Sequence, residues 1–198
     1  ESRPIKEWST RDESNLFPVD VNENTVGLLS YKKTDYQTTK IPIAINPAIK
    51  VEAMVIKSIL QKDFLTQVTS TNTFEEYDEY FLPKKSVLST NSGFGTKTTN
   101  IIYEPNNADG TGNSYFIGRL KCKEEIVTAY GDTKKSKQEY TYSNNQVETI
   151  KTYNNDYSGY VLETIDVYDG FGNVLEKTTT NSVDGQTTKV KDVYDDKG

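Results

Sequence analysis

The chain has 198 residues, enough for one ordinary domain or for part of a larger protein, and its mean hydropathy of −0.71 is polar for a compact globule. Its net charge of −6 comes from interspersed signs without a basic stripe, so nucleic-acid binding is not expected. The absence of histidine excludes histidine-dependent triads, histidine metal ligands and imidazole acid–base chemistry.

The aromatic content nevertheless argues against disorder. Fourteen tyrosines and seven phenylalanines supply a large burial area per residue and favour a thin aromatic interior, such as a sheet makes. The lone cysteine, Cys122, can form no internal disulfide. Because it lies in the alternating run LKCKEEIV, we interpret it as a small strand residue rather than a nucleophile.

Residues 1–49 are expected to be an irregular lead-in or pre-repeat segment. They contain few period-2 runs and open on the charged stretch RPIKEWSTRDESN, in which Trp8 is available as an anchor. The apolar stretch 41–60 is interrupted by two prolines, two lysines and a glutamate. It therefore cannot span a bilayer, and no membrane insertion is expected.

Residues 47–65 fit two descriptions. Ile49, Ala53, Ile56, Leu60 and Phe64 recur at helical spacing, whereas the alternation around Val51 and Val55 indicates a strand. Two strands are favoured, because β-branched residues dominate and no N-cap precedes Pro47. This reading places a break at 61–63 and a second strand in LTQVTSTNTFEEY.

From about residue 50, tyrosines recur at a constant interval. Tyr77 to Tyr103, Tyr142 to Tyr168 and Tyr168 to Tyr194 are each 26 residues apart. Within a unit, a Tyr-Asp turn leads into a strand, a second turn, and a strand that returns to tyrosine. The dipeptides Asp169-Gly170 and Asp184-Gly185 are typical of such turns, so each unit is predicted to be a β-hairpin.

The repeat has two departures. The unit that starts at Tyr142 has SNNQV where the turn glycine would fall. Between Tyr103 and Tyr142 the spacing grows to 39 residues, with the insert-like run EPNNADGTGNSYFIGRL.

These residues resemble the YD motif of RHS-repeat proteins, which reads Tyr-Asp, two residues, Gly, Arg or Asn, and an apolar residue. Tyr168-Asp169, Gly172 and Asn173 match it, followed by Val174. Tyr194-Asp195 and Gly198 match its first part, and Tyr77-Asp78 keeps the pair with Phe81 in place of glycine. The run SYFIGRLKCKEEIVT is similar to a stretch that precedes repeats in the B component of Tc toxins.

The resemblance implies an all-β fold of consecutive antiparallel hairpins over residues 50–198, in one extended, curled sheet that is a fragment of a hollow shell. In polymorphic and Tc toxins such a shell encloses a C-terminal effector polypeptide that is cleaved but stays inside. The self-cleaving protease of those proteins lies downstream of the repeats, so no catalytic residue, cofactor or metal is expected here, and the chain is not expected to be an enzyme.

The same resemblance implies a secreted or cell-surface protein whose partners are neighbouring repeats and the enclosed effector. We read the repeat region as truncated after Gly198, which predicts edge-to-edge self-association of the fragment through its last strand.

Four other motifs have alternative functional readings. SGFGTKTT (92–99) lacks the spacing of a phosphate loop and is expected to be a hairpin turn; PNNADGTGN (105–113) resembles a calcium loop but departs from the EF-hand order. The acidic cluster Glu75, Glu76, Asp78 and Glu79 is read as a solvated strand end rather than a glycosidase pair. The tyrosines, Tyr153 and Tyr157 among them, could instead form the sugar-binding platform of a surface adhesin, which is the competing hypothesis.

Overall fold

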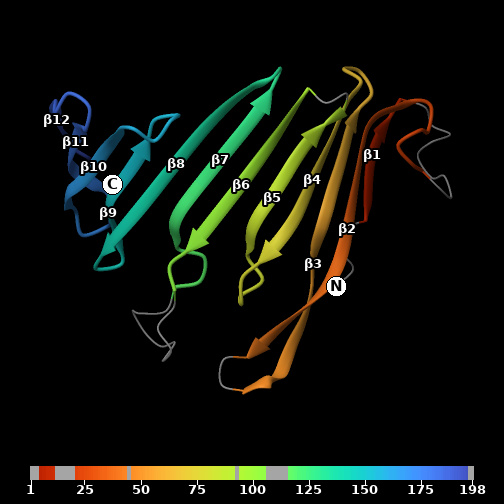
Figure 1. Cartoon of the computed structure of the whole chain (residues 1–198), viewed down its shortest axis with the longest axis horizontal. Helices are drawn as coiled ribbons and strands as arrows, with labels where there is room; N and C mark the ends of the chain where they lie inside the picture. The colour runs from red at the N-terminus through yellow and green to blue at the C-terminus, as the bar shows by residue number, and fades with distance from the viewer. Residues whose placement is uncertain (1–4, 12–20, 44–45, 92–93, 106–115, 196–198) are drawn as a thin grey trace. The chain divides into compact units, whose positions relative to one another are not determined.

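The computed structural model describes residues 5–11, 21–43, 46–91, 94–105 and 116–195, with the side chains of residues 41–51 excepted. In this part of the chain twelve strands form one open sheet in which the spatial order is the chain order, as Figure 1 shows. The strands are β1 (Lys6–Thr10), β2 (Leu28–Ile43), β3 (Asn46–Asp63), β4 (Val68–Tyr77), β5 (Pro83–Thr90), β6 (Gly95–Tyr103), β7 (Leu120–Ala129), β8 (Asp132–Ser143), β9 (Gln146–Tyr153), β10 (Tyr160–Tyr168), β11 (Val174–Asn181) and β12 (Thr187–Lys191). The predicted all-β class is confirmed.

Several connections between consecutive strands contain residues with left-handed backbone. Tyr130-Gly131 and Asn144-Asn145 both have positive φ at two successive positions, the geometry of a tight hairpin turn. They connect β7 to β8 and β8 to β9. No helix in the described residues is long and apolar enough to cross a membrane.

Two expectations about the N-terminal part are corrected. The described part of residues 1–49 is not irregular, because β1 and β2 lie in it and pair with each other. The preference for strand over helix at 47–65 is right, but the predicted break at 61–63 is wrong. β3 continues to Asp63 because Gln61, Lys62 and Asp63 pair on both sides, with β2 and with β4, and these ladders outweigh the low strand propensity of the three residues.

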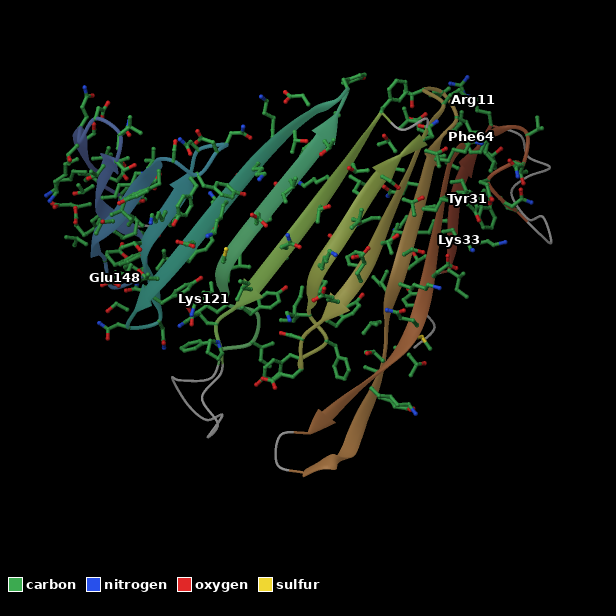
Figure 2. All side chains as sticks on the ribbon, in the orientation of Figure 1. Arg11, Tyr31, Lys33, Phe64, Lys121 and Glu148 are labelled. Atoms are coloured by element: carbon green, nitrogen blue, oxygen red, sulfur yellow. The ribbon has the colours of Figure 1, made fainter. Side chains whose placement is uncertain are left out.

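The chain divides into two compact units. The first contains residues 1–99 and 127–132, and the second contains 100–126 and 133–198. A small core lies in the first unit, where Val21, Leu28 and Tyr31 are buried and the half-buried Leu60 and Phe64 pack against them. Figure 2 shows the labelled Tyr31 and Phe64 at the same end of this group of strands.

The strands of the second unit are half-buried or exposed over nearly their whole length. The burial of β9 and β11 is intermediate at almost every position, and all five residues of β12 are exposed. The described buried side chains, Val21, Leu28, Tyr31, Thr34 and Val55, all belong to the first unit. The second unit is therefore held mainly by its ladders, its turns and cross-strand side-chain pairs.

Candidate functional site: the tyrosine–acid turns

The residues predicted to be repeat motifs lie at the ends of even-numbered strands. Tyr77, Tyr103, Tyr142 and Tyr168 end or nearly end β4, β6, β8 and β10, and Tyr194 follows β12. In a sheet of consecutive antiparallel hairpins, alternate turns lie at the same end of the strands. The recurring tyrosines therefore mark alternate turns of the chain, and each is followed by an acidic residue except Tyr142, which is followed by Ser143.

Four of these tyrosines make the same long-range hydrogen bond. The hydroxyl of Tyr142 donates to the carbonyl of Leu120 at 2.7 Å, and the hydroxyl of Tyr168 donates to that of Val147 at 2.6 Å. The hydroxyl of Tyr194 donates to the carbonyl of Val174 at 3.1 Å.

Tyr77 bonds the carbonyl of Ile56 in the same way. Each acceptor lies on the preceding odd-numbered strand, 20 to 22 residues earlier. The tyrosine thus ties the end of its strand to the neighbouring strand through the side chain as well as through the ladder.

Burial raises the pKa of Tyr77, Tyr142 and Tyr168, so all three phenols are protonated donors at neutral pH.

The turn after Tyr168 is organised by Asp169. Its Oδ1 accepts the backbone N–H of Phe171 and of Asn173, each at 2.8 Å. Its own N–H donates to the carbonyl of Asn173 at 3.0 Å, and Gly172, at φ +92°, donates to the carbonyl of Asp169 at 3.2 Å. The side-chain bond from Asn173 and these backbone donors lower the pKa of the carboxyl, which therefore acts as an ionised cap.

The turn after Tyr77 repeats the backbone bonds of this arrangement, while Leu82 stands where Asn173 adds its side-chain bond. Asp78 Oδ1 accepts the N–H of Tyr80 at 2.9 Å and of Leu82 at 2.8 Å. Asp78 N–H donates to Leu82, and Phe81 donates back to Asp78. Phe81 occupies the glycine position with φ +62°, a strained conformation for a bulky residue.

The two turns also share a strand irregularity. The register shifts twice just before Tyr77, where Phe74, Glu76 and Tyr77 pair with Ser86, Lys85 and Pro83. It shifts at the same places before Tyr168, where Ile165, Val167 and Tyr168 pair with Lys177, Glu176 and Val174. Such a bulge re-aims the following side chain, which accounts for the tyrosine reaching a carbonyl of the preceding strand.

The turn after Tyr103 has the closing backbone bond and the left-handed glycine of the turn after Tyr168, with an insertion between the two halves. Glu104 N–H donates to the carbonyl of Arg119 at 2.8 Å, as Asp169 does to Asn173, and Gly118 has φ +79°. Thirteen residues, 105–117, stand where residues 170 and 171 stand in the turn after Tyr168. Gly118 and Arg119 of the GRL run, which sequence likeness assigns to a separate resemblance, are the far half of this turn.

Arg119 is held at this turn by aromatic rings. Its guanidinium carbon lies 3.2 Å from the ring centroid of Phe116 and 4.5 Å from that of Tyr142. The guanidinium also donates to the carbonyl of Asn145 at 3.3 Å. Arg119 therefore joins the turn after Tyr103 to the turn after Tyr142.

A second polar cluster joins β7 to the turn between β9 and β10. Tyr157, at φ +63°, donates its hydroxyl to Glu124 at 2.8 Å, and Asn100 donates to the other oxygen of that carboxylate at 3.0 Å. Burial and the bond to the Glu124 carboxylate raise the pKa of Tyr157 to about 12. The same bonds lower the pKa of Glu124.

Neighbouring tyrosines complete this cluster. Tyr153 donates to Glu139 at 2.8 Å, and its ring centroid lies 5.9 Å from that of Tyr157 and 5.8 Å from that of Tyr160. The ammonium of Lys151 lies 4.0 Å from the Tyr160 centroid and 4.7 Å from that of Tyr153. These rings and hydroxyls are thus engaged with neighbouring strands. Sequence spacing could not reveal the Tyr157–Glu124 bond, which joins residues 33 positions apart.

Of the remaining candidates, Cys122 lines the same pocket as Asn100, Glu124 and Glu139. Cys122 is half-buried on β7, and burial raises the pKa of its thiol, which disfavours the reactive thiolate. Within the acidic stretch, Glu75 pairs with Lys85 at 2.8 Å while Asp78 caps its turn.

In the described residues no group of three or more acidic or cysteine side chains could hold a metal ion. The run PNNADGTGN (105–113) lies, apart from Pro105, outside the described residues, and so do residues 92–93 of the SGFG turn and Gly198.

Comparison of this chain with protein-family models, with curated proteins and with solved structures finds no match.

Proposed function

We propose that this chain is a non-catalytic structural segment, a length of wall from a repeat shell of the RHS type that encloses an effector polypeptide in the parent protein. The observation that carries the proposal is the recurrence of one device, a tyrosine hydroxyl tied to the preceding strand. Asp78 and Asp169, 91 residues apart, build corresponding caps after it.

The distribution of burial supports a wall rather than a folded globule. Strands of the second unit expose side chains on both faces. Asn100, Glu124, Lys137 and Glu139 line an open pocket together with Cys122, and these four polar side chains pair with each other or with Tyr153 and Tyr157. Residues of a catalytic centre would instead show a nucleophile and a base aimed at a common point.

The test uses the parent protein. Its C-terminal polypeptide should resist added protease while the wall is intact and become cleavable when the wall is weakened by Asp169→Ala. Phe171→Ala is the matched control, because this side chain in the same turn is 90% exposed. A C-terminal polypeptide that is cleaved equally fast in the unaltered parent would contradict enclosure.

The competing function is a carbohydrate-binding surface built on Tyr153, Tyr157 and Tyr160. The half-buried rings favour it, whereas their engagement with Lys151, Glu124 and Glu139 favours a packing role. A glycan-array signal that disappears in Tyr153→Ala or Tyr157→Ala while the fold persists would support the adhesin over the wall. The proposed wall predicts no glycan binding and no hydrolase activity.

A further inference from the structure

β2 and β3 are longer than the strands beside them. β4 pairs with β3 only through residues 58–63, and β1 bonds to β2 only through residues 28–34. Beyond these ladders the two strands continue as a two-stranded ribbon, residues 35–43 and 46–57, which Figure 1 shows in orange past the ends of their neighbours. A ribbon of two strands is only marginally stable in water, so its edges are candidates for further pairing.

The direction of the backbone groups along β3 follows from two hydrogen bonds and a bulge. Phe64 N–H donates to the carbonyl of Leu29 on β2, so even-numbered residues before the bulge face β2. Lys57 is an extra residue at the register shift, and it reverses this alternation. From Ile56 towards the tip of the ribbon, even-numbered residues therefore face away from β2. The hydroxyl of Tyr77 on β4 agrees with this direction, because it bonds the carbonyl of Ile56.

The two edges of the ribbon differ. On β3 the N–H and C=O groups of Lys50 and Glu52 point away from β2, and no described strand pairs with them there. On β2 the residue opposite Lys50 is Pro42, whose outward position has no N–H to offer. Proline protects sheet edges in this way. The β3 side, which is open because β3 is longer than its neighbour within the chain, is therefore the edge that can accept a strand.

We infer that this edge of β3 pairs antiparallel with the same edge of a second copy of the chain, with Val51 opposite Val51. This register places Lys50 of each copy opposite Glu52 of the other, so two opposite-charge pairs form around a two-fold axis. The neighbouring registers that keep outward residues opposite one another bring Lys50 opposite Lys50, or Glu52 opposite Glu52. Like charges directly opposite are destabilising, so the charges select one register and one partner. The inference does not depend on the proposed function.

Glu52 can accept a second lysine. Its carboxylate pairs with Lys40 across the ribbon, but the side chains of Glu52 and Lys40 are 53% and 60% exposed. Glu176 shows that one carboxylate of this sheet binds two ammonium groups, those of Lys189 and Lys191 at 3.1 and 2.9 Å. In the paired copies, Glu52 occupies the register position between Lys40 of its own chain and a lysine of the second copy.

Sedimentation equilibrium of the full chain over a range of concentrations tests the pairing. The unaltered chain should form a reversible dimer that added salt weakens. Lys50→Glu alone and Glu52→Lys alone should each weaken the dimer about tenfold or more, because both charge pairs then become like-charged. A chain that is monomeric at every concentration, or a dimer that neither substitution weakens, would overturn the inference.

Combining the two substitutions makes the test specific. A mixture of Lys50→Glu chains with Glu52→Lys chains should form a mixed dimer, and a chain that carries both substitutions should regain self-association, because opposite charges again face each other. This recovery also shows that the variants fold. Lys84→Glu is the matched control for charge, because Lys84 is exposed on β5, which has a strand on each side. It should dimerise like the unaltered chain, and failure of both recoveries would contradict the register.

Amide exchange measured by NMR locates the contact. The amides of Lys50 and Glu52 should exchange fast in the dilute chain and become protected as the concentration rises. Those of Thr38 and Lys40, which point outward on the β2 edge as Pro42 does, should not respond to concentration. Protection of Lys50 and Glu52 in the dilute chain would show that another segment of the same chain covers the edge, and protection that rises only in β1 or β12 would place the contact elsewhere. Either result would refute the inference.

Discussion

At the scale of single residues, the molecule is held by side chains that bond to backbone or to each other across strands. Tyr168 reaches the Val147 carbonyl, and Tyr157 reaches the Glu124 carboxylate. Because few described side chains are buried, these bonds contribute a larger share of the stability than they would in a protein with a thick apolar core.

Tyr168→Phe is expected to lower the free energy of unfolding by about 1 kcal/mol, the usual net contribution of one hydrogen bond. The substitution removes the hydroxyl and leaves the ring in place. Urea unfolding followed by circular dichroism measures the change. Tyr130→Phe is the control, because the ring of Tyr130 is 86% exposed at a turn. Equal effects of the two substitutions would show that the bond to Val147 contributes nothing.

Tyr157 should make stability fall at alkaline pH. Its pKa in the folded chain is about 12, and an unfolded tyrosine titrates near 10. A group whose folded pKa is raised stabilises fully below the unfolded pKa, and this stabilisation is lost as pH rises through the folded pKa. The free energy of unfolding should therefore decline from about pH 10 to about pH 12, and Tyr157→Phe should reduce the slope.

Urea titrations at a series of pH values measure this slope. Phe171→Ala serves as the control, because it removes an exposed side chain without a titratable group, and it should leave the slope as in the unaltered chain. A slope that Tyr157→Phe does not reduce would contradict the assignment of the Glu124 bond.

At the scale of elements, the turns after Tyr77, Tyr103 and Tyr168 share two features. Each has a closing backbone bond and a left-handed residue, which is Phe81, Gly118 and Gly172 in turn, and the turns after Tyr77 and Tyr168 add an aspartate cap. Three different sequences thus build related turns, because the backbone conformation and its hydrogen bonds, rather than the residue types, define the device.

Gly172→Ala should destabilise the chain by about 1 kcal/mol, because a Cβ is unfavourable at positive φ. The added Cβ would have enough space, since Gln146 Nε2 would be 3.7 Å away. The cost comes from the φ of +92°. Gly170→Ala, in the same turn, would meet nothing within 4 Å and has no such φ, so it should be nearly neutral. Thermal unfolding of both variants measures the difference; equal melting temperatures would refute the argument.

The turn after Tyr103 should tolerate removal of its insertion. Deleting residues 106–115 keeps Glu104, Phe116, Gly118 and Arg119, which make the closing bond and the stacking contacts. The melting temperature should change by no more than a few degrees, because the closing bond and the stacking contacts are retained and a shorter connection changes the closure entropy only slightly. A loss of cooperative unfolding would mean that the deleted residues help to hold β6 and β7 together.

At the scale of the whole molecule, the two units are stabilised in different ways. The first has the buried cluster of Val21, Leu28 and Tyr31, whereas the second has described strands that are at most half-buried. A core substitution should therefore act on the first unit, while turn substitutions such as those above act on the second.

Leu28→Ala should cost about 3 kcal/mol, as expected for truncation of a buried leucine; Leu28 is 5% exposed. Trp8, the lone tryptophan, pairs in register with Tyr31 and reports on the first unit. Its fluorescence transition in urea should shift to lower concentration. The half-buried Leu162→Ala is the control and should leave the tryptophan transition in place; equal shifts would indicate that the units unfold together.

The sequence by itself determined the all-β class, the strand-ending tyrosines and the Asp169 turn, because strand alternation and turn chemistry act between residues close in the chain. It did not reveal that Phe81 takes the place of glycine, since the local signal there opposes the conformation and the surrounding hydrogen bonds impose it. The weak strand propensity of residues 61–63 also predicted an end of β3 that is too early, because local propensity does not include the ladders with β2 and β4.

Only the tertiary structure decided which atoms meet across the sheet. The carbonyl that Tyr77 or Tyr168 reaches depends on strand order, on register and on the bulge before the tyrosine, and a shift of one residue would turn the side chain to the other face. The closure of the turn after Tyr103 by Arg119 and the bond of Tyr157 to Glu124 arise in the same way. Such contacts join residues far apart in the chain, so local sequence patterns do not predict them.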